Sequence, residues 1–590
     1  MKKFLLLSFM LTLTLTFSDS WAQERTISGK VSSIEDGSSL PGVNVVLKGT
    51  TTGTVTDIDG NYTLSVPSGG GTLVFSFIGL TTEESEIGSR SVIDIQMSPD
   101  VQQLSEVIVT ANNIAREKRT VGYGIAQVKG EDLTVSRETN IVNSLQGKTT
   151  GLIVNQSSGN PGGSSQVIIR GITSLAGNNN PLWVVDGVPI NNNQTTTGSR
   201  IAGNRDFFNG AAVINPDDVE SMSVLKGAAA TALYGSRAAA GAIVVTTKRG
   251  KKGQKGKPTI TLNSSFRSDR LFRSPDMQYQ FSGGANGTHD SSAVGNSFGA
   301  PIRGQIVTQA VTNERVPLRA FEDNFEDYYE TGRTFINNLA ISDANEKGDY
   351  RFSVTSLNQE GILPNSNFDR ITVNLGAGLK HTDWLSTRFG VQYIRSEVDG
   401  TGASGANDQN VIGWTTFTPT TDFNDFKPWI DESGNQINLP NITTNNPFWI
   451  RNENLNVRDD DRFIANMTQV ITPLENLNIT SRLGYDYEYD ERLITNRVGT
   501  ITALTGTYDV DVILRKQFNW DAIVDYTRSF GDITINGLLG YNYNSRVFER
   551  ERLSAQDLAV PNLFSPAASQ STVPVRDFSE SRLVGVYGQI

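Results

Sequence analysis

The sequence predicts a mainly β protein with three parts: an N-terminal β-sandwich, a small α+β domain and an incomplete antiparallel transmembrane β-barrel. The first observation is that, after Pro258, apolar and polar residues alternate in stretches of about ten residues, as in barrel strands. The second is that Asn478–Asp490 places Ile, Leu and Tyr on one face and Asn, Arg, Asp and Glu on the other. The third is that short and long connections separate these stretches, which is typical of barrel turns and loops.

Residues 1–22 are predicted to be a secretory signal peptide. Lys2 and Lys3 precede the apolar run Phe4–Phe17, and Ser20-Trp21-Ala22 offers small residues at a cleavage site before Gln23. The run is too short to span a bilayer, so it is not interpreted as a membrane anchor.

Composition restricts the function. The chain has no cysteine, which excludes a disulfide framework and thiolate metal sites, and its two histidines, His289 and His381, lack the spacing of zinc ligands. We therefore expect no metal, no cofactor and no catalytic residues. The formal charge of −11 argues against nucleic acid as a partner. A mean hydropathy of −0.29 and the lack of a long apolar run after the signal argue against a helical membrane protein.

Residues 23–100 are predicted to form the β-sandwich. Asp59-Gly60 is interpreted as a hairpin turn, because Asp57–Asn61 is too short for an EF-hand calcium loop. Leu40–Val45, Gly49-Thr50 and Phe77–Gly79 resemble the carboxypeptidase-regulatory-like domain, which implies a seven-stranded sandwich and no peptidase activity. The expected strands are Thr26–Val31, Val43–Lys48, Tyr62–Val66, Thr72–Ile78 and Val92–Met97.

Residues 101–121 contain a β-prone run, Leu104–Ala111, followed by a polar stretch. One interpretation is a last strand of the sandwich. The other is a strand that is offered to the sheet edge of another protein, which its position between two domains favours. The run also resembles the TonB box of energy-coupled outer-membrane transporters, and the residues concerned are Glu106, Val107, Ile108, Val109, Thr110 and Ala111.

Residues 122–250 are predicted to form the α+β domain. Ser136 is expected to cap a short helix that presents Ile141, Val142 and Leu145 and ends at Gly147, and Ala228–Tyr234 is expected to form a second helix. The expected strands are Leu152–Gln156, Gln166–Arg170, Leu182–Asp186, Val219–Leu225 and Ala242–Thr247.

Motifs in this domain resemble the plug of TonB-dependent receptors. They are Leu145–Lys148, Pro161-Gly162, Ile169–Gly171, Pro181–Pro189 and Val224–Gly227. Leu233–Gly250 resembles the signature of the SusC/RagA branch, although Ala240 stands where Asn is common. The resemblance implies that Arg170, Gly171, Asp186, Gly187, Gly235, Ser236 and Arg237 belong to plug motifs.

Charges inside a plug need partners, so we expect Arg170 and Arg237 to bond carboxylates of the plug or wall, either as a static bridge or as a contact that shifts on pulling. Asp186-Gly187 is interpreted as a tight turn rather than a ligand contact, and Gly235 is expected to serve backbone geometry. Residues 251–257 are rich in Lys and Gly, lack the ending of a P-loop, and are interpreted as a solvated basic linker.

Residues 258–590 are predicted to form the first part of the barrel wall. The same alternation would suit a soluble sandwich, but Tyr and Trp at strand ends favour membrane interfaces. A barrel that encloses a plug needs about 22 strands, so we expect a truncated, open half-wall. The ten expected strands are Thr259–Phe266, Thr334–Ser342, Asp349–Leu357, Arg370–Lys380, Leu385–Arg395, Arg462–Ile471, Asn478–Asp490, Gln517–Thr527, Asp532–Asn544 and Ser581–Ile590.

The resemblance implies a non-enzymatic importer in the cell outer membrane. It would carry an oligosaccharide or peptide with the TonB complex of the inner membrane and a SusD-like surface lipoprotein, surrounded by outer-membrane lipid. The loop aromatics Trp414, Phe417, Trp429 and Trp449 are candidates for stacking on substrate, or for packing within the loops. Two alternatives remain at this point: a siderophore or cobalamin receptor, and a secreted β-rich adhesin.

Overall fold

A computed structural model describes residues 24–589 except 35, 68–69, 99–106, 110–114, 118–123, 176–178, 194–197, 200–202, 228–229, 232–233, 254–256, 402, 405–416, 441–443, 502 and 532. The chain divides into two compact units, residues 1–107 and 108–590. Among the described residues, no helix has both the length and the apolar character needed to cross a membrane.

The first unit contains two sheets, with the orders β4-β1-β7 and β3-β2-β5-β6. Ile27, Val45, Tyr62 and Phe75 belong to the core that they enclose. All five predicted strands are present, and β3 and β6 were missed because they are short and polar. The strands are β1 Glu24–Ser33, β2 Asn44–Leu47, β3 Gly53–Val55, β4 Asn61–Pro67, β5 Thr72–Ser76, β6 Glu83–Glu86 and β7 Ile95–Met97.

The predicted hairpin at Asp59-Gly60 is wrong, although the turn is present. The turn joins β3 and β4, which lie in different sheets. The carboxylate of Asp57 accepts hydrogen bonds from the backbone N–H groups of Asp59 and Asn61, at 3.0 and 2.8 Å. The Asp57 carboxylate is therefore engaged in stabilising the turn.

Between the two sheets of the sandwich and the next domain, β8 (Val107–Val109) pairs with β9 (Ala115–Glu117) in a separate two-stranded sheet. The described part of this run therefore does not complete the sandwich, and that alternative is wrong. Glu106, Thr110 and Ala111 lie outside the described residues.

The α+β domain is built on a five-stranded sheet with the order β10-β17-β18-β13-β14, and β11 and β12 form a separate pair. The strands are β10 Ile125–Lys129, β11 Leu152–Gln156, β12 Ser165–Ile169, β13 Leu182–Val185, β14 Val188–Ile190, β17 Val219–Leu225 and β18 Ala242–Thr247. Trp183, Ile243 and Met222 are fully buried in its core.

The helix predicted from Ser136 is wrong. Arg137 has a φ of 44°, which interrupts a right-handed helix, and only the 3-10 turn η3 (Asn143–Leu145) follows. Ile141, Val142 and Leu145 are nevertheless fully buried, as expected for one apolar face. The predicted helix Ala228–Tyr234 lies partly outside the described residues, and the 3-10 turn η6 (Gly235–Ala238) follows it.

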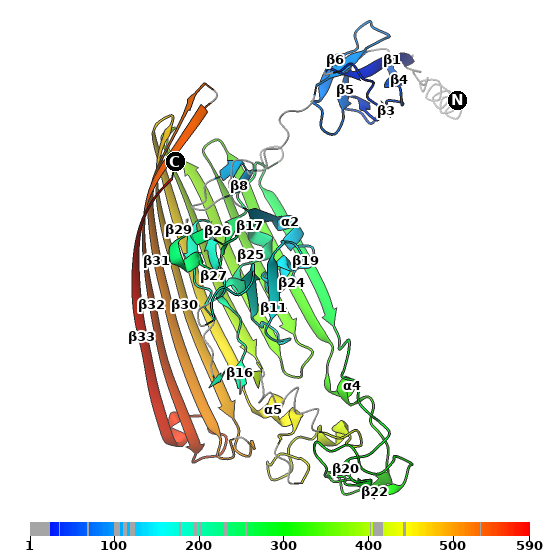
Figure 1. Cartoon of the computed structure of the whole chain (residues 1–590), viewed down its shortest axis with the longest axis vertical. Coiled ribbons are helices and arrows are strands. Elements are labelled where there is room, and N and C mark those ends of the chain that lie inside the picture. Colours follow the sequence, from blue (N-terminus) through cyan, green and yellow to red (C-terminus); the bar gives the residue numbers. More distant parts are fainter. Residues whose placement is uncertain are drawn as a thin grey trace, which may run out of the picture. The chain divides into compact units, whose positions relative to one another are not determined.

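The wall is one ten-stranded antiparallel sheet in which neighbouring strands follow one another in the chain. At one end its strands are joined by short turns, such as those at 346–347, 381–384 and 475–476. At the other end longer loops join them, and two of these loops carry α4 (Asn324–Tyr328) and α5 (Pro447–Glu453) (Figure 1). The strands are β19 Thr259–Asp269, β24 Gly332–Asn345, β25 Gly348–Glu360, β26 Asn367–Lys380, β27 Leu385–Asp399, β29 Asn456–Leu474, β30 Leu477–Asn496, β31 Thr507–Phe530, β32 Ile533–Leu558 and β33 Ser569–Gln589.

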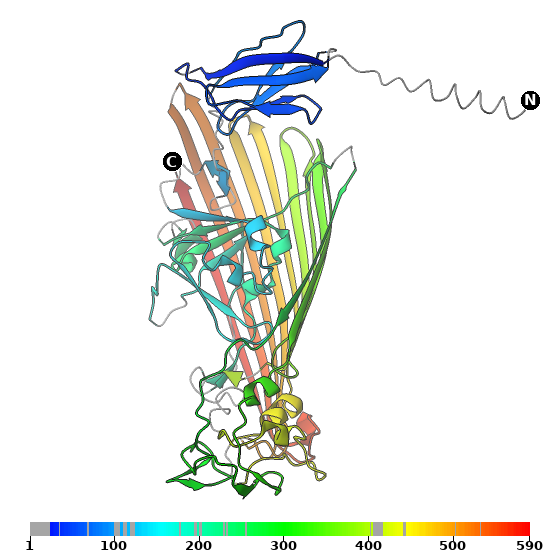
Figure 2. The same cartoon turned by 90° about the vertical axis from the view of Figure 1, so that its right-hand side faces the viewer.

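The two faces of the wall have the opposite polarity to those of a soluble sheet. On β30, Arg482, Asp486 and Asp490 are buried, whereas Leu483 and Tyr485 on the other face are exposed. The α+β domain lies against the polar face (Figure 2). A soluble sandwich would bury the apolar face, so this arrangement excludes that alternative and fits a barrel wall in lipid.

Candidate functional site

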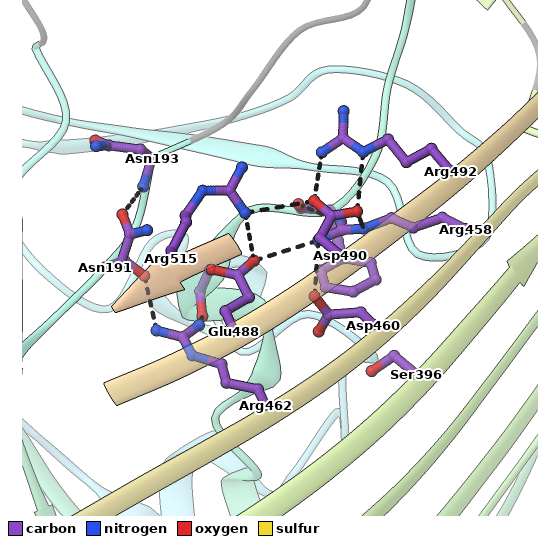
Figure 3. Close-up of polar contacts among 12 residues, drawn as sticks. Asn191, Asn193, Ser396, Arg458, Asp460, Arg462, Glu488, Asp490, Arg492 and Arg515 are labelled. Carbon is purple, nitrogen blue, oxygen red and sulfur yellow. Dashed lines mark hydrogen bonds and ion pairs between the residues drawn. The ribbon is translucent and has the colours of Figure 1, made fainter. Parts of the chain in front are cut away.

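The α+β domain contacts the wall through a buried network of charges on β29, β30 and β31 (Figure 3). Arg458 binds Asp490 at 2.9 Å and Asp460 at 3.1 Å. Arg492 binds Asp490 at 2.7 Å, and Arg515 binds Glu488 at 2.9 Å. Three guanidinium groups thus neutralise three carboxylates, which is the condition for keeping such groups out of water.

The wall arginines also donate to the backbone of the α+β domain. Arg458 donates to the carbonyl of Phe208 at 3.0 Å. Arg462 donates to the carbonyls of Gly210 and Asn191, at 2.7 and 2.9 Å. Each of these donors carries a full charge, so these bonds are stronger than neutral ones.

Arg462 is held in this position by Asp486 on the neighbouring strand. The carboxylate accepts from Nε at 2.8 Å and from Nη2 at 2.7 Å, a bidentate pairing. Asp486 also accepts from the backbone N–H of Asn191 at 2.9 Å. One wall ion pair therefore binds both a donor and an acceptor of the same loop of the α+β domain.

A second group of contacts lies on β25 and β26. Arg351 and Ser353 both bond the carboxylate of Asp218, at 2.6 and 2.7 Å. Arg370 donates to the carbonyl of Ala212 at 2.6 Å. Asp218 is thus a carboxylate of the α+β domain that pairs with the wall.

Two aromatic side chains complete the contact. Phe207 and Phe208 are buried, and the guanidinium of Arg458 lies 3.7 Å from the ring centre of Phe208, while that of Arg492 lies 4.7 Å from Phe207. Cations over aromatic faces are attracted by the ring quadrupole. We call residues 205–218 the docking segment, since most of the contacts described above converge on it.

Sequence reasoning did not identify the docking segment or its wall partners. Arg462 stands on the polar face of a predicted strand, so the alternation indicated its direction but not its partners, and Arg458, Arg492 and Arg515 lie outside the predicted strands. The available signal in the docking segment was the pair Phe207-Phe208 in front of the small residues Gly210, Ala211 and Ala212.

The side chain of Arg170 is exposed, and it forms no ion pair with any described residue. A bond from Arg170 to a carboxylate was expected, and the described residues do not show one. Arg170 and Gly171 instead form a bend with φ values of 58° and 97°, and the Arg170 N–H donates to the carbonyl of Gly151 at 2.8 Å.

Arg237 faces the wall without a direct ion pair among the described residues. It lines a cavity of about 250 Å³ together with Gly235, Ser236 and the wall residue Asp521. A direct bond from Arg237 to a carboxylate was expected, and the described residues do not show one. Gly235 has a φ of 70°, which fits its predicted backbone role.

Asp186-Gly187 is the tight turn that the sequence predicted, between β13 and β14. Both residues have positive φ, 48° and 85°, as a type I′ hairpin turn requires. The Asp186 carboxylate accepts from the N–H and the hydroxyl of Thr247, at 3.0 and 2.7 Å. A Cβ on Gly187 would collide with Arg482, so the turn lies tightly against the wall.

The loop aromatics that the structure describes are packed inside the loops. Phe417 belongs to a cluster with Tyr328, Phe423 and Phe426, and Trp449 is fully buried and donates to the hydroxyl of Thr500 at 3.0 Å. Trp429 is partly buried and donates to Glu453 at 2.8 Å. Loop packing is therefore the role of Phe417 and Trp449, and Trp414 lies outside the described residues.

Lys251, Lys252 and Lys257 of the basic linker are exposed. Gly250 and Gly253 are less open, because their N–H groups donate to Asp349 and Asp343 at 3.3 Å each. The linker thus begins against the turn between β24 and β25.

Comparisons with known proteins agree with this architecture. The CarboxypepD_reg-like domain family matches residues 27–109, and the TonB-dependent Receptor Plug Domain family matches residues 117–242. The chain is 29% identical to TonB-dependent receptor P3 of Formosa agariphila over 586 residues, which cover 96% of this chain and 53% of that receptor. It is 32% identical to TonB-dependent receptor SusC of Bacteroides thetaiotaomicron over 357 residues, 60% of this chain and 32% of SusC.

Among solved structures, the RagAB peptide importer in its open-open state matches with a TM-score of 0.64 at 20% identity, covering 82% of this chain and 54% of that one. The chain spans about half the length, or less, of the curated relatives it matches. The plug-family match, the wall and these relatives show that the chain is built like part of a TonB-dependent receptor. Within that class it is similar to SusC/RagA proteins, as its motifs predicted, and the α+β domain matches the plug domain of these receptors.

Proposed function

We propose that this chain is part of an importer that moves an oligosaccharide or peptide across the outer membrane with energy from the TonB complex. The observation that carries the proposal is the polarity of the wall: its apolar face is exposed, and its charged face binds a plug. The relatives named as TonB-dependent receptors support it, and the likeness to the RagAB peptide importer supports a peptide as one cargo class.

In this mechanism the cargo binds on the side of the long loops, where a SusD-like lipoprotein acts as the lid. The TonB complex then adds a strand to Glu106–Ala111 and pulls on the plug. To release the docking segment, Arg458 and Arg462 must exchange plug carbonyls for water. Each step is binding or displacement, so no covalent chemistry is required.

Deletion of Glu106–Ala111 in the full-length receptor tests the coupling. We expect uptake to be lost while surface assembly stays normal. Replacing Val107 and Val109 with Pro should have the same effect, because Pro removes the N–H donors that strand addition uses. Replacing both with Thr is the control, since Thr keeps a β-prone backbone. Normal uptake by the deletion variant would disprove the coupling role.

A further inference from the structure

A cavity of about 570 Å³ lies between the plug and the half of the wall next to the short turns. On the plug side it is lined by Val185, Asp186 and residues 247–250, which end β13 and β18. On the wall side it is lined by inward residues of β25 to β31. Its volume lies within the range of ligand pockets, roughly 300–1,000 Å³.

The wall lining offers amide groups that have no partner. Asn374, Gln392 and Asn466 point inward on β26, β27 and β29, and within the described chain their side chains bond to no protein group. Elsewhere on the inner face some amides donate to protein groups: Gln517 donates to the carbonyl of Pro189 at 2.6 Å, and Asn338 donates to Thr355 at 2.7 Å. The three amides at the cavity are open to a solute instead.

Several charged groups around the cavity have partners in the protein. Arg388 binds Asp349 at 2.5 Å, and Asp525 accepts from Asn478 at 2.9 Å. Lys248 donates to the carbonyl of Asp217 at 2.9 Å. The lining therefore offers both the three neutral amides and exposed charged side chains, such as those of Arg249 and Glu346, to a solute.

Glycines keep the wall side open. A Cβ on Gly376 would meet no other atom within 4 Å, so this position faces open space. A Cβ on Gly378 would collide with Arg388, so Gly378 makes room for the ion pair with Asp349.

We propose that this cavity is a transit site that cargo occupies after it has passed the loop side of the plug. Its ligand is a chain of hydrogen-bonding groups, either sugar hydroxyls or peptide amides, which replace the water bound to Asn374, Gln392 and Asn466. The site lies beside the Asp186-Gly187 turn, so displacement of that turn widens it. This inference rests on the proposed function.

The test fills the cavity in the full-length receptor. Gly376→Trp places a bulky side chain in the open space, and Leu375→Trp is the matched control, because Leu375 is exposed on the outer face of the same strand. Cells receive a mixture of short neutral oligosaccharides or a mixture of tryptic peptides, and depletion from the medium is followed by mass spectrometry. We expect Gly376→Trp to lower the uptake of one mixture by about tenfold or more, as expected for an occluded pocket, with normal binding at the surface.

A second variant separates blockage from misfolding. Gly376→Cys is assembled first and then labelled with a bulky thiol reagent, which is selective because the 590-residue chain has no cysteine. Labelling should lower uptake in the same way. If Gly376→Trp and the labelled Gly376→Cys variant both take up as much as Leu375→Trp, the transit site is contradicted, while the proposed function is not. Wild-type receptor that takes up neither mixture in a box-dependent way would overturn the proposed function as well.

Discussion

At the scale of single residues, Arg458 and Arg462 each bind wall carboxylates and plug carbonyls at the same time. Arg462 neutralises Asp486 and donates to two plug carbonyls, and Arg458 combines its carboxylates with the carbonyl of Phe208. A hydrogen bond to a charged group contributes about 1.5–3 kcal/mol. Several such bonds hold the resting plug firmly, yet each one can be replaced by water when the plug is pulled.

Arg462→Ala should destabilise the full-length receptor by about 3–5 kcal/mol, because it leaves the buried Asp486 carboxylate without its cation. The free energy of unfolding in detergent, from a denaturant titration, measures this loss. Arg462→Lys is the control: it keeps the charge but loses the bidentate fork, so it should be less harmful. An Ala variant as stable as the wild type would contradict the role of this contact.

The buried carboxyl of Asp217 in the plug should make the stability of the folded protein depend on pH. Burial raises the pKa of its carboxyl above 3.8, and Arg137 at 3.1 Å opposes that rise. The folded state therefore binds this proton more tightly than the unfolded state. The contribution of Asp217 to the free energy of unfolding therefore falls as pH rises from about 3.8 through the raised pKa of the folded state. Above that pKa the contribution no longer changes with pH.

Asp217→Asn should remove that contribution. The difference in melting temperature between wild type and variant, followed across acidic pH, should then change in the variant's favour as pH rises. A difference that does not depend on pH would show that the Asp217 carboxyl has the same pKa in both states.

The partners of these residues could not be predicted from the sequence, although Arg462 and Asp486 stood in predicted strands. The alternation placed these two residues on the polar face, whereas Arg458 precedes the predicted strand. It gave no information on which loop of the plug they meet. The charged residue chosen instead, Arg170, is exposed and lies in a bend with a positive φ.

At the scale of elements, the β13–β14 hairpin is held both by its turn and by the wall. Gly187→Ala adds the strain of positive φ, about 1–2 kcal/mol, and a collision with Arg482. Gly235→Ala has a similar φ but meets no atom within 4 Å, so it carries the strain alone. We expect Gly187→Ala to lower the melting temperature more than Gly235→Ala. Equal decreases in melting temperature for the two variants would show that the contact with Arg482 adds no destabilisation at Gly187.

Wall strands were predicted well in position but too short. β31 begins at Thr507 rather than Gln517, and β29 begins at Asn456 rather than Arg462. The strand residues that the prediction left out lie on the side of the long loops. There, charged residues such as Asp509 and Asp511 interrupt the apolar pattern on which the prediction depends. The helix from Ser136 failed for a different reason: tertiary packing uses Arg137 in a left-handed bend.

At the scale of the whole molecule, the wall buries its polar face against the plug and exposes its apolar face, the reverse of a soluble sheet. The charged residues of β30 are buried against the plug, and Leu483 and Tyr485 face outward. This inversion could be predicted because alternation, connection lengths and plug motifs agreed. The loop region could not be, since two long irregular loops pack around a core that includes Tyr328 and Phe426 and has no periodic pattern.

The most direct test of this account is the accessibility of single spin labels along β30 in the full-length receptor in a lipid bilayer. Labels are placed at Ile479, Leu483 and Tyr485 on the outer face, and at Thr480 and Gly484 on the inner face. Oxygen, which concentrates in lipid, should relax the outer labels strongly and the inner labels weakly, with a period of two residues. Equal relaxation on both faces, or strong relaxation of the inner labels, would contradict a wall with lipid outside and the plug inside.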